Sequence, residues 1–184
     1  NVICQDLQFG AKIGCKPEFR SPSKASNAPS AFADGPKVTD AICQWLKQGF
    51  AYGPVDIAEV PAHAKFNGIM TRPKPTGAAR IILNLSSPEG SSVNDGISSS
   101  DFPTTMSSTA HWLNALNSCG KGCYMVKIDW SDAYKHVSVH PVDTDLQWFQ
   151  WLGKCFKETS LVWSPKPMMG CRNDVNFKGS KFIS

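Results

Sequence analysis

Long hydrophobic runs are missing from this sequence of 184 residues. None approaches the roughly 20 apolar residues that a membrane-spanning helix requires. The start also lacks a basic segment followed by an apolar one, so it resembles neither a secretory signal nor a transit peptide. Because the chain opens with Asn1 and not with Met, we expect an internal fragment. These absences argue against a membrane protein and favour an intracellular one, cytoplasmic or nuclear.

A dense framework of paired cysteines is missing as well. The 7 cysteines are an odd, scattered set, which favours reduced thiols inside a cell. Cys119 and Cys123 flank Gly-Lys-Gly, which is not a usual zinc spacing, and no second pair lies nearby. His136 and His140 alternate along a predicted strand, and we interpret them as exposed strand residues. We therefore expect no zinc site.

Acidic residues are absent between Glu59 and Glu89. The same window contains four basic residues, which are Lys65, Arg72, Lys74 and Arg80. A local basic patch can hold phosphates, but it can also be a solvated face. Charge by itself leaves both interpretations open.

The composition changes along the chain in a way that predicts three regions. Residues 16–36 are rich in Pro, Ser and Ala and poor in large apolar side chains, which is typical of a linker with little fixed structure. We therefore expect a loosely ordered N-terminal arm over residues 1–36. One folded unit should follow over residues 37–163, and residues 164–184, which lack periodicity, should form an irregular tail.

Two stretches have the apolar spacing of a helix. The first begins at Val38 and predicts a helix of about ten residues, with Thr39 or Asp40 as its N-terminal cap and Gly49 at its end. The second stretch covers residues 104–118. The first is a short amphipathic helix, and the second places Met106, Ala110 and Leu113 on one stripe.

Short apolar runs between turn residues predict the strands. Residues 81–85 form one such run, and residues 123–128 form a second that we expect to be buried. Alternation over residues 137–139 predicts that a strand resumes there. Residues 146–151 and 155–162 predict a hairpin. Helices followed by strands and hairpins indicate the α+β class.

Two acids follow the buried run in "YMVKIDWSDAYKHVSVHP", residues 124–141. Asp129 would stand at the end of a strand, where a rigid backbone can present a carboxylate to Mg²⁺. Catalysis by two metal ions needs at least one further carboxylate from elsewhere. Alternatively, Asp129 caps a turn and Asp132 pairs with Lys127 or Lys135 on the surface. Spacing alone favours the second, structural interpretation.

Three segments, in order along residues 38–163, resemble the reverse transcriptases. "KIDWSDAY" resembles the first catalytic motif of the palm, and "RPKPTGAARIILNLSSPEGSSVNDGI" before it looks like the fingers segment. "VSVHPVDTDLQWFQWLGKCFKETSLVW" is similar to the strand and hairpin after that motif. The pair "LSSPEGSSVNDGI" and "DWSDAYKHVSVHP" most resembles retroelements of the DIRS type. The resemblance implies a partial right-hand polymerase fold, the fingers and the N-terminal half of the palm, with an antiparallel sheet and packed helices.

The resemblance also implies roles for the residues of the palm motif. Asp129 would be the catalytic residue that binds both Mg²⁺ ions. Asp132 and the backbone around it, including Ala133, would lie under the triphosphate of the incoming deoxynucleotide. Tyr134 would stand beneath the sugar and exclude a 2′-hydroxyl by its bulk. The alternative for Tyr134 is a buried aromatic side chain on the core face.

In the fingers segment, Lys74 and Arg80 match the basic pair that holds the triphosphate. Lys65 and Arg72 have no firm counterpart, and we interpret them as solvated surface residues. The implied partners are an RNA or DNA primer–template and a deoxynucleotide, with Mg²⁺ as the cofactor.

Other polar and aromatic residues after the motif are interpreted as structural. Asp143 and Asp145 follow a proline and are expected to serve turn geometry only. The tryptophans could stack on bases, but core or hairpin packing is the favoured interpretation; they are Trp148, Trp151 and Trp163.

One family feature is missing. The reverse transcriptases continue to a Tyr-x-Asp-Asp hairpin, whereas no adjacent Asp-Asp pair occurs in these 184 residues. The resemblance therefore implies a polymerase fragment truncated before that motif and inactive alone. Two alternatives stay open: a non-catalytic nucleic-acid-binding module, and a product that retains only the fold.

Overall fold

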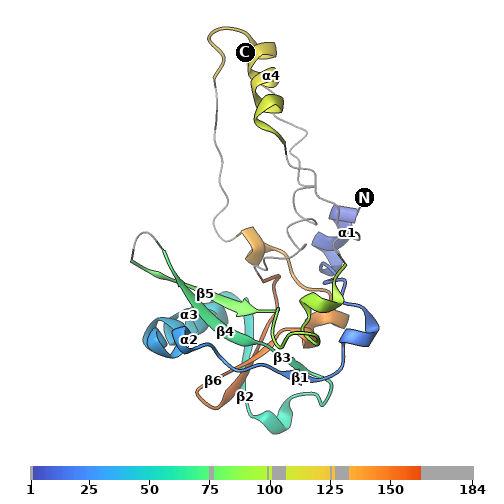
Figure 1. Cartoon of the computed structure of the whole chain (residues 1–184), viewed down its shortest axis with the longest axis vertical. Helices are drawn as coiled ribbons and strands as arrows, with labels where there is room; N and C mark the ends of the chain where they lie inside the picture. The colour runs from blue at the N-terminus through green and yellow to red at the C-terminus, as the bar shows by residue number, and fades with distance from the viewer. Residues whose placement is uncertain are drawn as a thin grey trace.

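The computed structural model describes residues 2–74, 77–98, 100, 107–124, 126 and 133–162. Within them lies a mixed α/β fold with a five-stranded sheet in the order β1-β3-β6-β7-β2 (Figure 1). Its strands are β1 (Ser23–Lys24), β2 (Ala51–Val55), β3 (Lys65–Phe66), β6 (Trp148–Trp151) and β7 (Lys154–Glu158). The short 3₁₀ turns are η1 (Pro17–Phe19), η2 (Ile57–Glu59), η3 (Asn94–Gly96), η5 (Ala133–His136) and η6 (Pro141–Leu146).

The expectation of an antiparallel sheet is wrong for half of this sheet. β6 pairs antiparallel with β7, and β7 pairs antiparallel with β2. By contrast, β1 and β3 pair parallel with each other, and β3 pairs parallel with β6. Parallel neighbours require long connections, and here they join segments far apart in the chain, which no local pattern reveals.

The predicted hairpin near the end of the described chain is confirmed as β6 and β7. Its turn consists of Leu152 and Gly153, whose φ angles are 47° and 80°. Two successive positive φ values are the signature of a type I′ turn, which matches the twist of the flanking strands. The tryptophans of β6 are buried, with Trp148 2% and Trp151 4% exposed. The packing interpretation is therefore confirmed for these two; Trp163 lies outside the described residues.

A separate two-stranded ladder consists of β4 (Gly68–Pro73) and β5 (Ala79–Asn84). β5 confirms the strand predicted over residues 81–85. The two strands pair antiparallel, with Gly68 opposite Asn84 and Arg72 opposite Arg80. The apolar part of the ladder is buried, whereas its turn end projects from the rest of the fold (Figure 1).

Helix α3 (Gly35–Gln48) starts earlier than the sequence pattern predicts. Pro36 stands in its first turn, where a missing N–H costs nothing and the ring presets φ. Thr39 is therefore inside the helix and is not its cap: its hydroxyl donates to the carbonyl of Gly35 at 3.0 Å. The predicted end is confirmed, because Gly49 takes the left-handed conformation at φ 75°.

The expectation of little fixed structure over residues 16–36 does not match the structure. This segment contains η1, β1 and α2 (Pro29–Ala33). The amide of Ala25 donates to Phe66 at 2.9 Å, and that of Ala28 donates to Ile69 at 2.8 Å. Long-range backbone bonds, which composition cannot show, order the segment.

Two further helices are α1 (Val2–Phe9) and α4 (Thr109–Cys119). α4 confirms the helix predicted within residues 104–118. No residue of α4 is buried, however, and Trp112 and Leu113 are 62% and 55% exposed. No helix of the described ranges is long and apolar enough to span a membrane.

Two predicted strands are not found among the described residues. Of the run 123–128, the described Tyr124 and Val126 are exposed, against the expected burial; Met125 and residues 127–128 lie outside the description. Tyr134 lies within η5, and only isolated bridges follow this turn over residues 137–139, pairing Ser138 with Ser160 and Val139 with Ala11. The predicted tail, residues 164–184, is also outside the described ranges.

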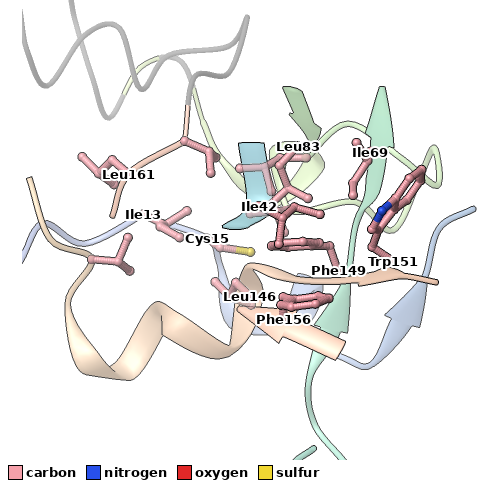
Figure 2. Packing of buried hydrophobic residues seen from close by; sticks show 14 of the residues in the cluster. Ile13, Cys15, Ile42, Ile69, Leu83, Leu146, Phe149, Trp151, Phe156 and Leu161 are labelled. Atoms are coloured by element: carbon pink, nitrogen blue, oxygen red, sulfur yellow. The ribbon is translucent and has the colours of Figure 1, made fainter. Parts of the chain in front are cut away.

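One core joins the two β units (Figure 2). Its side chains come from the N-terminal segment, α3, the β4–β5 ladder and the β6–β7 hairpin, and include Ile13, Cys15, Ile42, Ile69, Leu83, Phe149, Trp151 and Phe156. The rings of Phe149 and Phe156 stack at 5.5 Å between centroids. Burial of these aromatic and branched side chains is the main stabilising contribution to the fold.

Candidate nucleotide and nucleic-acid interface

Three cations lie at the projecting end of the β4–β5 ladder: Arg72, Lys74 and Arg80. We call the part of the ladder that carries them the basic hairpin. All three side chains are exposed. Arg72 and Arg80 are direct cross-strand partners, so their side chains leave the same face of the ladder. Lys74 follows at the turn, where its amide donates to Ala78 at 2.7 Å. Like charges placed opposite each other disfavour the ladder.

The root of the basic hairpin is held by the segment before α3. Besides the bond from Ala28, the side chain of Asn27 accepts the amide of Ile69 at 2.8 Å, and that of Ser30 accepts the amide of Thr71 at 3.1 Å. These side chains satisfy the free edge of β4 in place of another strand. The cations therefore stand on a rigid base.

Gly68, at the start of β4, allows the close approach of that segment. A Cβ atom at this position would lie 2.2 Å from the carbonyl oxygen of Ser26. Every other residue type would force the two chains apart. Glycine here is thus a condition for the anchored root.

The sequence interpretation of Lys65 as a solvated surface residue is wrong. Lys65 is 1% exposed, and its ammonium donates to the carbonyls of Ser21 at 3.0 Å and Ser91 at 2.6 Å and to the hydroxyl of Ser23 at 3.0 Å. Burial lowers the pKa of Lys65, although Cys15 and Asp95 oppose the shift. Because all three N–H groups have protein partners, this lysine ties the chain together and is not offered to a phosphate. Arg72, by contrast, is exposed as expected.

Asp129 and Asp132, the expected centre of the site, lie outside the described residues. Their distance from Lys74 and Arg80 therefore stays a prediction. Among the described ranges, no group of three or more His, Cys, Asp or Glu residues could hold a metal ion. The expected Mg²⁺ ligand, Asp129, lies outside those ranges.

The residues directly after these acids are described. Ala133 begins the turn η5, and Tyr134, the next residue of this turn, is half-buried. Half-burial is compatible with either interpretation of this tyrosine. The next residue, Lys135, forms a buried ion pair with Glu158 of β7.

Asp143 does more than shape a turn. It is 1% exposed, accepts the amide of Ile13 at 2.7 Å and forms an ion pair with Arg20. These contacts attach the N-terminal segment to η6. The prediction of turn geometry alone is wrong for this residue.

Asp145 likewise has side-chain partners on other elements. It accepts the indole N–H of Trp148 at 3.0 Å and contacts His63 at 2.9 Å and Lys157 at 3.2 Å. Burial raises the pKa of Asp145, but these hydrogen bonds outweigh it, so the pKa lies below its usual value. The prediction for Asp145 is therefore wrong in the same way.

The two histidines are not strand residues either. His136 is exposed but belongs to η5. His140 precedes η6 and accepts the amide of Val142 at its Nδ1 atom, at 3.3 Å. The alternating residues that predicted a strand, 137–139, lie between these two turns and form only isolated bridges.

No family model and no curated protein matches the chain. Solved structures do match. One is a selenomethionine-labelled mutant of the protease–reverse transcriptase of prototype foamy virus. The match has TM-score 0.51 and 22% identity, and it covers 77% of this chain and 17% of the viral one. A foamy viral protease–reverse transcriptase solved with double-stranded DNA has TM-score 0.47, 21% identity, and 77% and 22% coverage. One solved with an RNA/DNA hybrid has TM-score 0.43, 20% identity, and 77% and 16% coverage.

The first of these matches defines the fold class. The described fold matches part of a reverse-transcriptase-like fold, as the sequence resemblance implies. The chain spans about a sixth of the length of that viral protein, for which 17% is covered. At 22% identity the likeness concerns the fold alone.

Proposed function

We propose that this chain is the nucleotide-binding and template-binding part of an RNA-directed DNA polymerase from a retroelement of the DIRS type. It comprises the fingers and the N-terminal half of the palm. One observation carries the proposal: an anchored hairpin of exposed cations projects from a fold that matches part of a viral reverse transcriptase with TM-score 0.51. Clustered cations on a rigid support are suited to the dense charge of phosphates.

Each site residue then has a role in binding. Lys74 and Arg80 hold the triphosphate and meet the charge that develops on it. Asp132 and the backbone at Ala133 lie beneath the triphosphate. Tyr134 stands beneath the sugar, where its ring excludes a 2′-hydroxyl. Asp129 holds Mg²⁺, whose charge orients and neutralises the phosphate oxygens when the ion is bound.

Turnover needs more than these residues provide. Catalysis by two metal ions requires carboxylates beyond Asp129, and the 184 residues contain no adjacent aspartate pair. We therefore propose that these residues bind primer–template and deoxynucleotide but do not extend a primer by themselves.

The exposed basic hairpin also supports a second candidate, a non-catalytic nucleic-acid-binding module. Primer extension with Mg²⁺ or Mn²⁺ would contradict the inactivity proposed above. Selective binding of a deoxynucleotide over a ribonucleotide supports the polymerase fragment, whereas equal or no nucleotide binding together with primer–template binding favours the module.

Salt-dependent binding to a primer–template tests the second candidate, in which Lys74 and Arg80 contact the phosphates of the nucleic acid. Each phosphate contact contributes about 0.9 to the slope of log K against log salt for a duplex. The double variant Lys74→Ala/Arg80→Ala should therefore reduce that slope by about 2. Lys12→Ala/Lys47→Ala removes the same charge from exposed positions elsewhere and is the matched control. Equal losses in the two variants, or no binding at about 50 mM salt, would leave a product that retains only the fold.

A further inference from the structure

The chain just after Tyr134 is attached to the sheet by its backbone. The amide of Val139 donates to Thr159, and the amide of Leu161 donates to Val137, both at 2.9 Å. Within the turn, the amide of Val137 donates to the carbonyl of Tyr134 at 3.4 Å. The next side chain, Lys135, reaches two other elements of the fold.

Lys135 lies between two elements of the core. Its ammonium forms an ion pair with Glu158 of β7 and stands 4.1 Å from the ring centroid of Trp45 of α3. The side chains of Lys135 and Glu158 are only 15% and 2% exposed. A cation over an indole, paired with a carboxylate out of water, has one favoured geometry.

This pair is poorly suited to stabilising the fold. The second carboxylate oxygen of Glu158 is buried and has no hydrogen-bond partner among the described residues, and the same holds for Gln147 Oε1 and Ser160 Oγ beside it. Burial raises the pKa of Glu158, against the opposing effect of Lys135. Well-packed apolar residues commonly stabilise a core as well as a buried ion pair does, or better. A role in positioning accounts for retaining the charges.

We propose that Lys135, clamped by Glu158 and Trp45, is a positioning residue that holds η5 so that Tyr134 can select the sugar of the incoming nucleotide. This inference rests on the proposed function. Lys135 contacts no reacting atom in this scheme. It acts through the backbone it shares with Tyr134, one residue away.

The test separates position from stability. Lys135→Met/Glu158→Leu removes both charges but keeps apolar bulk, so the chain should fold. Glu158→Gln keeps the shape and removes only the carboxylate charge, and it serves if the double variant does not fold. The exposed pair formed by Lys154 of β7 and Asp56, which follows β2, provides the control Lys154→Met/Asp56→Asn.

Two measurements are made on each variant. Fluorine NMR of protein labelled with 3-fluorotyrosine, with the signal of Tyr134 assigned by Tyr134→Phe, reports where this ring sits. Competition binding reports the preference for a deoxynucleotide over the matching ribonucleotide. We expect the Tyr134 signal to shift or broaden, and the preference to fall about 10- to 100-fold, the penalty typical of a displacement on the order of 1 Å. The control should match the wild-type chain in both.

An unchanged Tyr134 signal in a folded variant overturns the inference, and so does a shifted signal with an unchanged preference. A wild-type chain that binds neither nucleotide overturns the proposed function, and the sugar-selecting role with it. In that case the NMR signal still shows whether the pair positions the ring, so the two failures are distinguishable.

Discussion

Replacing Lys65 by Met should destabilise the protein strongly, although the sequence suggests a surface position. The methionine retains most of the apolar stem and removes the ammonium. That group donates three hydrogen bonds, to Ser21, Ser23 and Ser91, from a side chain that is 1% exposed. Their acceptors belong to β1, the chain just before it, and the loop before η3, so the change should loosen the contact between these segments.

The size of the effect follows from two opposing contributions. A hydrogen bond to a charged group stabilises by about 1.5–3 kcal/mol. Three such bonds are lost, but the variant also avoids the desolvation of a buried ammonium, which costs several kcal/mol. We expect a net loss of about 2–4 kcal/mol in the free energy of unfolding. For a chain of this size that corresponds to a fall in Tm of about 5–15 °C.

Urea and thermal unfolding, followed by circular dichroism, measure this difference. Its pH dependence gives a second check. Because burial lowers the pKa of Lys65, the folded state binds fewer protons than the unfolded state between that lowered pKa and about 10.4, the ordinary value for lysine. Wild-type stability should therefore rise with pH through this window, whereas the methionine variant lacks the effect. The gap between the two should widen as the pH rises.

Lys24→Met is the matched control, because Lys24 is exposed on β1 close to the same contact. It should change stability by no more than about 0.5 kcal/mol. If both variants lose the same small amount, Lys65 is solvated and the buried-anchor interpretation is refuted.

Three further changes test the remaining contacts by chemical denaturation. Gly68→Ala should cost about 1–3 kcal/mol, because its methyl group would meet the carbonyl of Ser26 at 2.2 Å; no loss would show that the root can move apart. In the wild-type chain the raised pKa of Glu158 makes the folded state bind the proton more tightly, so stability should fall as the pH rises from about 4.3. Glu158→Gln should remove this fall, and parallel pH profiles of the two chains would contradict the reasoning. Asp143→Asn should cost about 1–3 kcal/mol, less than a fully buried pair, because Arg20 is 34% exposed and can be solvated; an unchanged midpoint would show that the pair contributes nothing.

Local chemistry made the β6–β7 hairpin and the end of α3 predictable. Gly49 ends α3 because a residue without a Cβ atom takes positive φ at little cost. The β6–β7 hairpin follows from two apolar runs around a short turn. The start of α3 was placed too late because its first turn carries no apolar periodicity, although Pro36 was an available signal.

The roles of charged residues were the hardest to predict. Lys65 and Lys74 lie in the same acid-free window, yet one is buried and the other exposed. Whether each lysine side chain is buried depends on which distant serines and carbonyls approach its ammonium. Asp143 differs from a turn residue for the same reason, because its partners lie about 120–130 residues earlier in the chain. Sequence spacing contains no record of such contacts.

By itself the amino-acid sequence determined the β6–β7 hairpin, strand β5, helices α3 and α4, and the motifs that resemble those of the reverse transcriptases, because these depend on neighbours a few residues apart. Tertiary structure alone decided that the N-terminal segment is ordered, that the sheet is mixed and that Lys65 and Lys135 are internal. Those outcomes depend on which segments exclude water from one another. That exclusion is a property of the folded chain as a whole.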